Sequence, residues 1–109
     1  MSSPAILIID DEKAIRAALR DILEHEKHTV EEAEDGAAGL AVAKRLKFDL
    51  VLCDIKMPKM DGIEVLENLH EYDPDLPVVM ISGHGSIDTA VDALRKGAFD
   101  FIQKPPDIN

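Results

Sequence analysis

A chain of 109 residues, 46% of them hydrophobic, is long enough to bury one core, so we expect a single compact domain. Its formal net charge of -10 argues against a nucleic-acid-binding surface, which needs clustered lysines and arginines to neutralise phosphates. The single cysteine, Cys53, excludes an internal disulfide. The sequence shows no signal peptide or long apolar span, which predicts a soluble, cytoplasmic protein without a membrane segment.

The first half of the chain alternates short apolar runs with helical periodicity. Residues 5–9, AILII, predict a strand, and an amphipathic helix is predicted after it by Ile15, Ala18, Leu19, Ile22 and Leu23. Residues 28–33, HTVEEA, predict a polar strand, and a second helix is predicted by Ala37, Leu40, Ala43 and Leu46. Residues 49–53, DLVLC, predict a buried strand.

The second half repeats this alternation. A third helix is predicted by Ile63, Leu66 and Leu69, and it should end before the prolines of residues 73–77. Residues 78–81, VVMI, predict a fourth strand. A fourth helix, with Gly97 suited to cap its end, is predicted by Ile87, Ala90, Val91 and Leu94. Residues 99–102, FDFI, predict a fifth strand.

Five strands alternating with helices predict a doubly wound α/β domain, in which right-handed crossovers build a parallel sheet covered on both faces. The most polar strand, residues 28–33, belongs at an edge of the sheet. That position favours the strand order 2-1-3-4-5 of flavodoxin-like folds over a dinucleotide-binding order. In such sheets ligands bind beyond the carboxyl ends of the strands, so the residues that follow the strands are the candidates for a site.

Polar side chains follow four of the predicted strands. They are Asp10, Asp11 and Glu12 after the first, Asp54 after the third, Ser82 after the fourth and Lys104 after the fifth. Carboxylates that are brought close together repel one another, and a bound cation relieves that repulsion. Mg2+ prefers carboxylate, carbonyl, water and phosphate oxygens. The sequence therefore predicts a site for Mg2+ and a phosphoryl group.

Four stretches resemble, in order and at typical separations, the receiver domains of two-component response regulators: IIDDE (8–12), DIKMPKMDG (54–62), ISGHGS (81–86) and KP (104–105). The resemblance covers essentially the whole chain. It implies that Asp54 is the phosphoacceptor and that Ser82 and Lys104 contact the phosphoryl group. It also implies a set of Mg2+ ligands, namely Asp10, Asp11, Asp54 and the backbone carbonyl of Lys56. Phe101 falls at the family's aromatic switch position.

The function that this resemblance implies is a phosphorylation-controlled switch. A sensor histidine kinase donates a phosphoryl group to Asp54, Ser82 and Phe101 rearrange, and binding to an attached effector domain or partner protein changes. A phosphorylation-linked dimer is one form of this output. The stretch over residues 83–105 most resembles receivers of sigma-54-dependent activators of transcription. The domain itself is then regulatory rather than an enzyme with turnover, and it does not contact nucleic acid directly.

Other interpretations of the same residues stay open. An Asp-nucleophile phosphatase or phosphotransferase acting on an external substrate usually carries a second Asp two residues after the nucleophile, where this chain has Lys56. A flavodoxin-type flavin module needs a phosphate-binding loop after the first strand, where DDE would repel phosphate. Asp54 alone could be a turn residue, and the acidic residues 10–12 could be helix caps. Only their joint order with Ser82 and Lys104 favours the site.

The chain ends at KPPDIN, where a fifth helix would be expected to begin. Asp107 is a good N-cap residue with almost no helix after it. We therefore expect the domain to be truncated before its last helix and the native gene product to continue past Asn109. Since helices cover both faces of a parallel sheet, we also expect an uncovered apolar face near residues 15–23 through which this chain dimerises.

Overall fold

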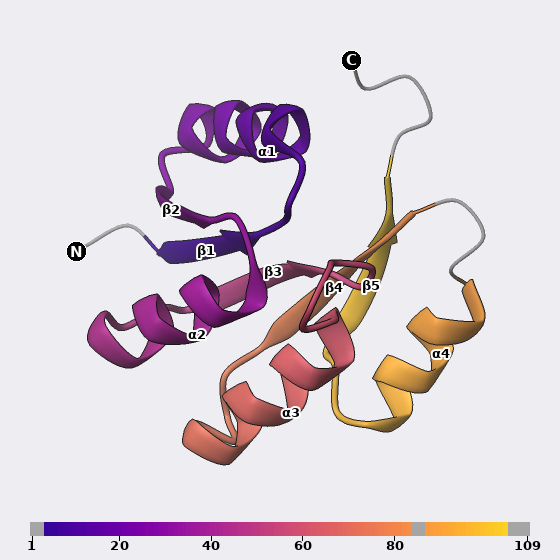
Figure 1. Ribbon diagram of the computed structural model, residues 1–109. Helices are drawn as coiled ribbons and strands as arrows, with labels where there is room; N and C mark the ends of the chain where they lie inside the picture. Colours follow the sequence, from indigo (N-terminus) through magenta and orange to yellow (C-terminus); the bar gives the residue numbers. More distant parts are fainter. Residues whose placement is uncertain (1–3, 84–86, 105–109) are drawn as a thin grey trace.

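The computed structural model describes residues 4–83 and 87–104 of the chain. Five parallel strands form one sheet in the order β2-β1-β3-β4-β5 (Figure 1). The strands are β1 (Ala5–Ile9), β2 (Thr29–Ala33), β3 (Leu50–Asp54), β4 (Val78–Ser82) and β5 (Asp100–Gln103). The helices in the described residues are α1 (Lys13–His25), α2 (Gly36–Arg45), α3 (Gly62–Tyr72) and α4 (Ile87–Arg95). The predicted fold class and strand order are confirmed, whereas Asp107 and the expected start of a fifth helix lie outside the described residues.

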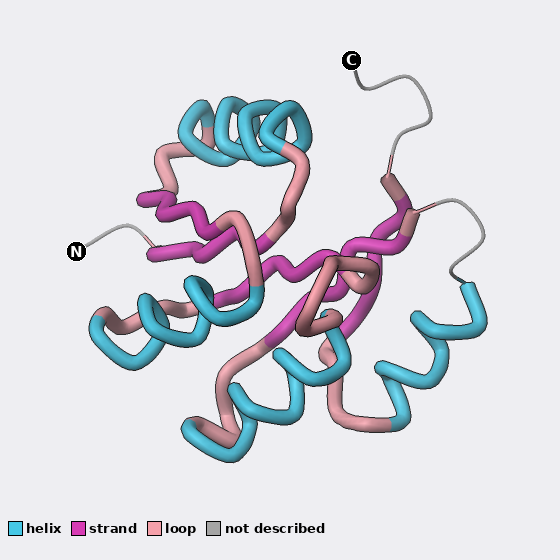
Figure 2. Tube along the Cα trace, viewed as in Figure 1, coloured by secondary structure: helices cyan, strands magenta, loops and turns pink. Residues whose placement is uncertain are grey.

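The helices form layers on the two faces of the sheet, with α1 on one face and α2, α3 and α4 on the other (Figure 2). Successive strand residues point to opposite faces, so the strands supply two separate apolar clusters. The cluster beneath α2–α4 includes Leu7, Ile9, Val51, Cys53 and Met80. The cluster on the α1 face includes Ile6, Ile8, Leu52, Val79 and Ile81. Central strands buried on both faces explain the near-continuous apolar runs in the sequence.

Short polar side chains start two of the helices. The Asp35 carboxylate accepts a hydrogen bond from the Ala38 N–H at the start of α2, and the Asp61 carboxylate accepts one from the Glu64 N–H at the start of α3. Each bond satisfies a backbone donor that has no partner within its own helix. The cap at Asp61 also ends the loop that follows β3, and so helps to set the shape of the backbone beside Asp54.

The predicted apolar stripe of α4 is wrong in part. The helix buries Ala90 and Ala93, while Ile87, Val91 and Leu94 are exposed. Small side chains let the helix backbone lie close to β4 and β5, and this turns the larger apolar residues outward. The predicted cap is confirmed, since Gly97 has a φ of 110°, a conformation that glycine adopts without the strain other residues incur.

The sheet face that α1 covers was expected to be partly uncovered, and Ile102 of β5, which lies beside Ile81 of the cluster on this face, is 42% exposed. Ile15 is buried and Leu19 and Leu23 pack against the cluster on the α1 face, whereas Ile22 is 60% exposed. Dimerisation through this face stays a prediction. In the described part of the chain no helix is long and apolar enough to cross a membrane.

Candidate functional site

The predicted site residues meet at the carboxyl edge of the sheet. Asp10 and Lys104 directly follow β1 and β5, while Asp54 and Ser82 are the last residues of β3 and β4. Asp10 is 0% exposed, Asp54 2% and Ser82 0%, and they are the buried polar side chains among the described residues. Burying a polar or charged group costs free energy unless it finds a partner. Three such groups at one edge of the sheet therefore mark this edge as the candidate site.

Four acidic residues form a cluster at this edge. One carboxylate oxygen from each of Asp10, Asp11, Glu12 and Asp54 lies within 4.8 Å of the others. Two ligands on opposite sides of a Mg2+ ion are about 4 Å apart, because each Mg–O distance is about 2.0–2.1 Å. The four oxygens, up to 4.8 Å from one another, are spread slightly more widely than the coordination sphere of one hard cation, so binding would draw these side chains together.

Asp10 has one oxygen that lacks a hydrogen-bond partner. Its Oδ1 accepts a hydrogen bond from the Glu12 N–H at 2.8 Å, but its fully buried Oδ2 accepts none from residues 4–83 and 87–104. The Lys104 Nζ lies 3.3 Å from Oδ2, an ion-pair distance whose geometry does not make a hydrogen bond. A buried acceptor without a partner loses its hydration without replacement. A cation coordinated by Oδ2 would replace the lost hydration. The unpaired oxygen and the acidic residues around it therefore fit a divalent ion.

Lys104 brings a positive charge into the acidic cluster. Its Nζ lies 3.2 Å from Asp54 Oδ2 and 3.0 Å from Glu12 Oε1, in addition to its contact with Asp10. Burial disfavours the ammonium ion, but the hydrogen bond to Glu12 and the charges of Asp10 and Asp54 outweigh it and raise the pKa of Lys104 above its ordinary value. Lys104 is therefore positively charged throughout the physiological pH range.

The two buried carboxyl groups of the cluster, those of Asp54 and Asp10, hold protons more tightly than usual. Burial and the charge of Asp10 raise the pKa of Asp54 from 3.8 to about 6, although Lys104 opposes the shift. Burial also raises the pKa of Asp10, against the hydrogen bond from Glu12 and the charge of Lys104. Protons and a metal cation therefore compete for the same oxygens.

The remaining predicted residues lie around this cluster rather than within it. The Ser82 hydroxyl is hydrogen-bonded to the Gly83 carbonyl at 3.3 Å, while the Ser82 carbonyl accepts the Lys104 N–H and joins the ends of β4 and β5. Phe101 is half-buried and packs against the cluster beneath α2–α4. Lys56 is exposed, two residues after the buried Asp54.

Sequence reasoning named Glu12 among the residues of the site but not among the Mg2+ ligands, and it missed Arg16 altogether. Glu12 was visible as a third acidic residue after the first strand, but its contact with Lys104 joins positions far apart in the chain. Arg16 donates a hydrogen bond from Nη1 to the Asp10 carbonyl at 2.7 Å. It lies on the half-polar α1 with no motif around it, so the sequence carries no signal for this contact.

Comparisons with known proteins place this geometry in a family. The model of the family described as response regulator receiver domain matches residues 6–109. The transcriptional regulatory protein ZraR of Klebsiella oxytoca is 39% identical over 95% of this chain and 24% of its own length. The nitrogen assimilation regulatory protein NtrX of Azorhizobium caulinodans is 43% identical over 92% of this chain and 22% of its own length. The chain thus spans about a quarter of the length of the curated relatives it matches.

Solved structures show the same architecture. The crystal structure of the receiver domain of NtrX from Brucella abortus is 45% identical, with a TM-score of 0.89 over 92% of this chain and 85% of that one. A CheY-like response regulator receiver domain protein from Methanospirillum hungatei is 40% identical, with a TM-score of 0.89 over 97% of this chain and 85% of that one. Since the family model also spans nearly the whole sequence, the chain belongs to the response regulator receiver domains.

Proposed function

We propose that this domain is a switch in which Asp54 accepts a phosphoryl group from the phosphohistidine of a sensor histidine kinase in a Mg2+-dependent step. The observation that carries the proposal is the place of Asp54. Its buried carboxylate ends the central strand β3 between the acidic residues of the β1–α1 loop and the ammonium group of Lys104. A carboxylate in such a place can act as a nucleophile once the negative charge around it is neutralised.

The proposed transfer forms a bond between an Asp54 carboxylate oxygen and phosphorus. The P–N bond of the donor breaks, and its electron pair leaves with the imidazole of the kinase. Lys104 attracts the incoming phosphoryl oxygens, because its ammonium is a compact charge on a flexible stem. Ser82 can offer its hydroxyl to a phosphoryl oxygen by giving up its weak bond to the Gly83 carbonyl. The step needs positioning and charge more than covalent help from the protein.

The residues proposed to hold Mg2+ are Asp10, Asp11, Asp54 and the Lys56 carbonyl. Glu12 is placed to join them directly or through a water molecule, since its carboxylate belongs to the same cluster. When bound, Mg2+ supplies positive charge that offsets the negative charge of the carboxylates and of the transferring phosphoryl group. Lys104 would then be free to turn from the carboxylates towards the phosphoryl oxygens.

The proposed output is a change in what the α4–β5 surface binds. Ile87, Val91 and Leu94 expose apolar side chains on α4, and Phe101 on β5 connects the end of the sheet to the core. A phosphoryl group adds charge and acceptor oxygens at one point, and Ser82 and Phe101 would pass that change to this surface. Because relatives are named transcriptional regulatory proteins, we infer an effector that controls transcription, with the sigma-54-dependent class as its predicted type and a phosphorylation-linked dimer as one form of the output.

The test of this function is phosphate uptake by the purified chain. A small phosphodonor such as acetyl phosphate, given with Mg2+, should label the protein with up to one equivalent of hydroxylamine-labile phosphate. Continuous release of phosphate from an external phosphoester would instead support the phosphatase interpretation. A yellow protein with a flavin spectrum would support the flavodoxin interpretation.

We expect Mg2+ to raise the melting temperature, and to raise it more at pH 7.5 than at pH 5. The pKa of Asp54 in the folded domain, about 6, lies above its ordinary value of 3.8, so protonation stabilises the folded state. That contribution is fully present below about pH 4 and is lost as the pH rises through 6. At pH 7.5 the cation takes the place of the lost proton, whereas at pH 5 it must displace one. Thermal melts at equal ionic strength measure both shifts, and equal or absent shifts would count against the metal site.

Replacing Lys104 by alanine is expected to impair switching more than folding. With Mg2+ present, the loss in free energy of unfolding should be about 1 kcal/mol or less, because the cation still neutralises the carboxylates. Without Mg2+ the loss should be larger, since Asp10 and Asp54 then remain buried without a nearby cation. Lys96→Ala, which removes a surface pair with Asp92, is the matched control. Amide chemical shifts before and after phosphorylation report the switch, and an unfolded Lys104→Ala protein in Mg2+ would make Lys104 structural.

A further inference from the structure

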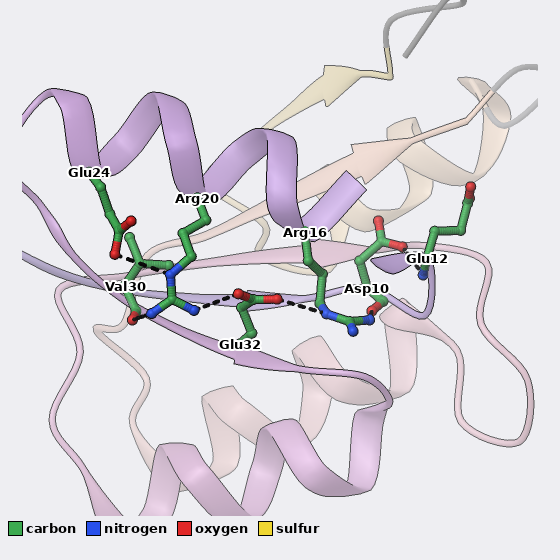
Figure 3. Close-up of polar contacts among 7 residues, drawn as sticks. All are labelled: Asp10, Glu12, Arg16, Arg20, Glu24, Val30 and Glu32. Carbon is green, nitrogen blue, oxygen red and sulfur yellow. Dashed lines mark hydrogen bonds and ion pairs between the residues drawn. The ribbon is translucent and has the colours of Figure 1, made fainter. Parts of the chain in front are cut away.

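We propose that Arg16 is a positioning residue for the cation site: it fixes the backbone of Asp10 so that the free carboxylate oxygen faces the acidic cluster. This inference rests on the proposed function of the site. Arg16 does not belong to the cluster itself. It acts through Asp10, and its contacts run from α1 to the end of β1 (Figure 3).

The polar groups of Asp10 are held in three directions. Its N–H donates to the Ala33 carbonyl at 3.1 Å, which ties it to the end of β2. Its carboxylate Oδ1 accepts the Glu12 N–H at 2.8 Å. Its carbonyl accepts the hydrogen bond from Arg16 Nη1 at 2.7 Å. In the part of the chain that the structure describes, only Oδ2 is left without a hydrogen bond, so the remaining contacts together determine where that oxygen points.

Arg16 is itself held in place. Its Nε donates to Glu32 Oε1 at 3.0 Å, and its side chain is only 13% exposed. Burial by itself would raise the pKa of Glu32. The hydrogen bonds from Arg20 and Arg16 have the larger effect, and the pKa lies below its ordinary value. Glu32 therefore stays ionised and anchors the guanidinium. A planar guanidinium can donate hydrogen bonds to a carboxylate and to a carbonyl at the same time from two different nitrogens. A lysine has a single nitrogen and cannot reproduce this geometry.

The competing interpretation is that these contacts only fasten α1 to the edge strand β2. Arg20 offers the comparison that separates the two. It also forms an ion pair with Glu32, and it also donates to a backbone carbonyl, that of Val30, at 3.0 Å. Figure 3 shows both arginines on one side of α1, with Glu32 between them. The two differ in which carbonyl they bind, since only the carbonyl bound by Arg16 belongs to a proposed metal ligand.

The experiment compares Arg16→Met with Arg20→Met. Each variant keeps an unbranched stem and removes the donors, so each should lower the melting temperature measured without Mg2+. Isothermal titration with MgCl2 should show the Mg2+ dissociation constant raised roughly 10-fold in Arg16→Met, the size typical for loss of a group that orients a metal ligand. Arg20→Met should keep the dissociation constant of the unaltered protein. Arg16→Lys, which retains the charge but has a single donor nitrogen, should fall between the unaltered protein and Arg16→Met.

Each outcome decides between the interpretations. The inference would be overturned if the Mg2+ dissociation constant were unchanged in Arg16→Met, or raised equally in Arg16→Met and Arg20→Met. The contacts of Arg16 would then serve only to hold α1 against β2. If Arg16→Met does not fold, Arg16→Lys is compared with Arg20→Lys by the same titration and the same criterion. Absence of Mg2+ binding in the unaltered protein would overturn the proposed function itself, which distinguishes the two failures.

Discussion

Phosphate uptake is expected to be abolished when Asp54 is replaced by asparagine, while the fold stays intact. The amide has nearly the same shape as the carboxylate and fits the same buried place, but it cannot act as the nucleophile. The raised pKa of Asp54 shows that its negative charge is unfavourable in the folded domain at neutral pH. Without Mg2+ at pH 7.5, Asp54→Asn should therefore be at least as stable as the unaltered protein.

The measurement is incorporation of phosphate from acetyl phosphate with Mg2+ present, together with a thermal melt. Asp61→Asn is the matched control, because Asp61 lies in the loop after β3 and caps α3, a role that asparagine also fills. The control should take up phosphate like the unaltered protein. Undiminished labelling of Asp54→Asn would move the acceptor to another residue and remove the central element of the proposal.

The largest loss of stability from a small substitution near the site is expected for Gly62→Ala. A Cβ on Gly62 would lie 2.2 Å from the Asp54 carbonyl oxygen and 2.8 Å from the Ile55 Cα, and both are backbone atoms. Gly62 is also held there by its N–H, which donates to the Ile55 carbonyl at 2.7 Å. Overpacking of this kind costs about 1–3 kcal/mol or more. The gain in helix propensity from alanine, about 1 kcal/mol at most, is too small to offset it.

The clash also displaces the backbone that carries the phosphoacceptor, so phosphate uptake should fall along with the free energy of unfolding. Gly83→Ala is the matched control, since among the described residues a Cβ there would meet only the Lys104 Cδ, at an ordinary 4.0 Å. Urea unfolding of both variants measures the difference. If Gly62→Ala is as stable as Gly83→Ala, the close approach of the β3–α3 backbone at Gly62 does not constrain the domain.

The fold class and the meeting of the main site residues could be predicted from the sequence by itself. Apolar runs of strand length alternating with helical periodicity require a parallel sheet, and the polar run at 28–33 was correctly assigned to an edge. Asp10, Asp54, Ser82 and Lys104 each end or follow a strand, and the carboxyl ends of parallel strands share one edge. Their convergence therefore follows from chain order alone.

Only the tertiary structure decided which surfaces are buried and which distant groups touch. Periodicity marks the apolar residues of α4, but close packing on the sheet favours Ala90 and Ala93 and leaves Ile87 outside. The contacts of Lys104 with Glu12 and of Arg16 with Asp10 depend on how loops and a helix are placed against the sheet. The raised pKa of Asp54 likewise comes from burial beside another carboxylate. These are properties of positions in space, and no local pattern of residue types encodes them.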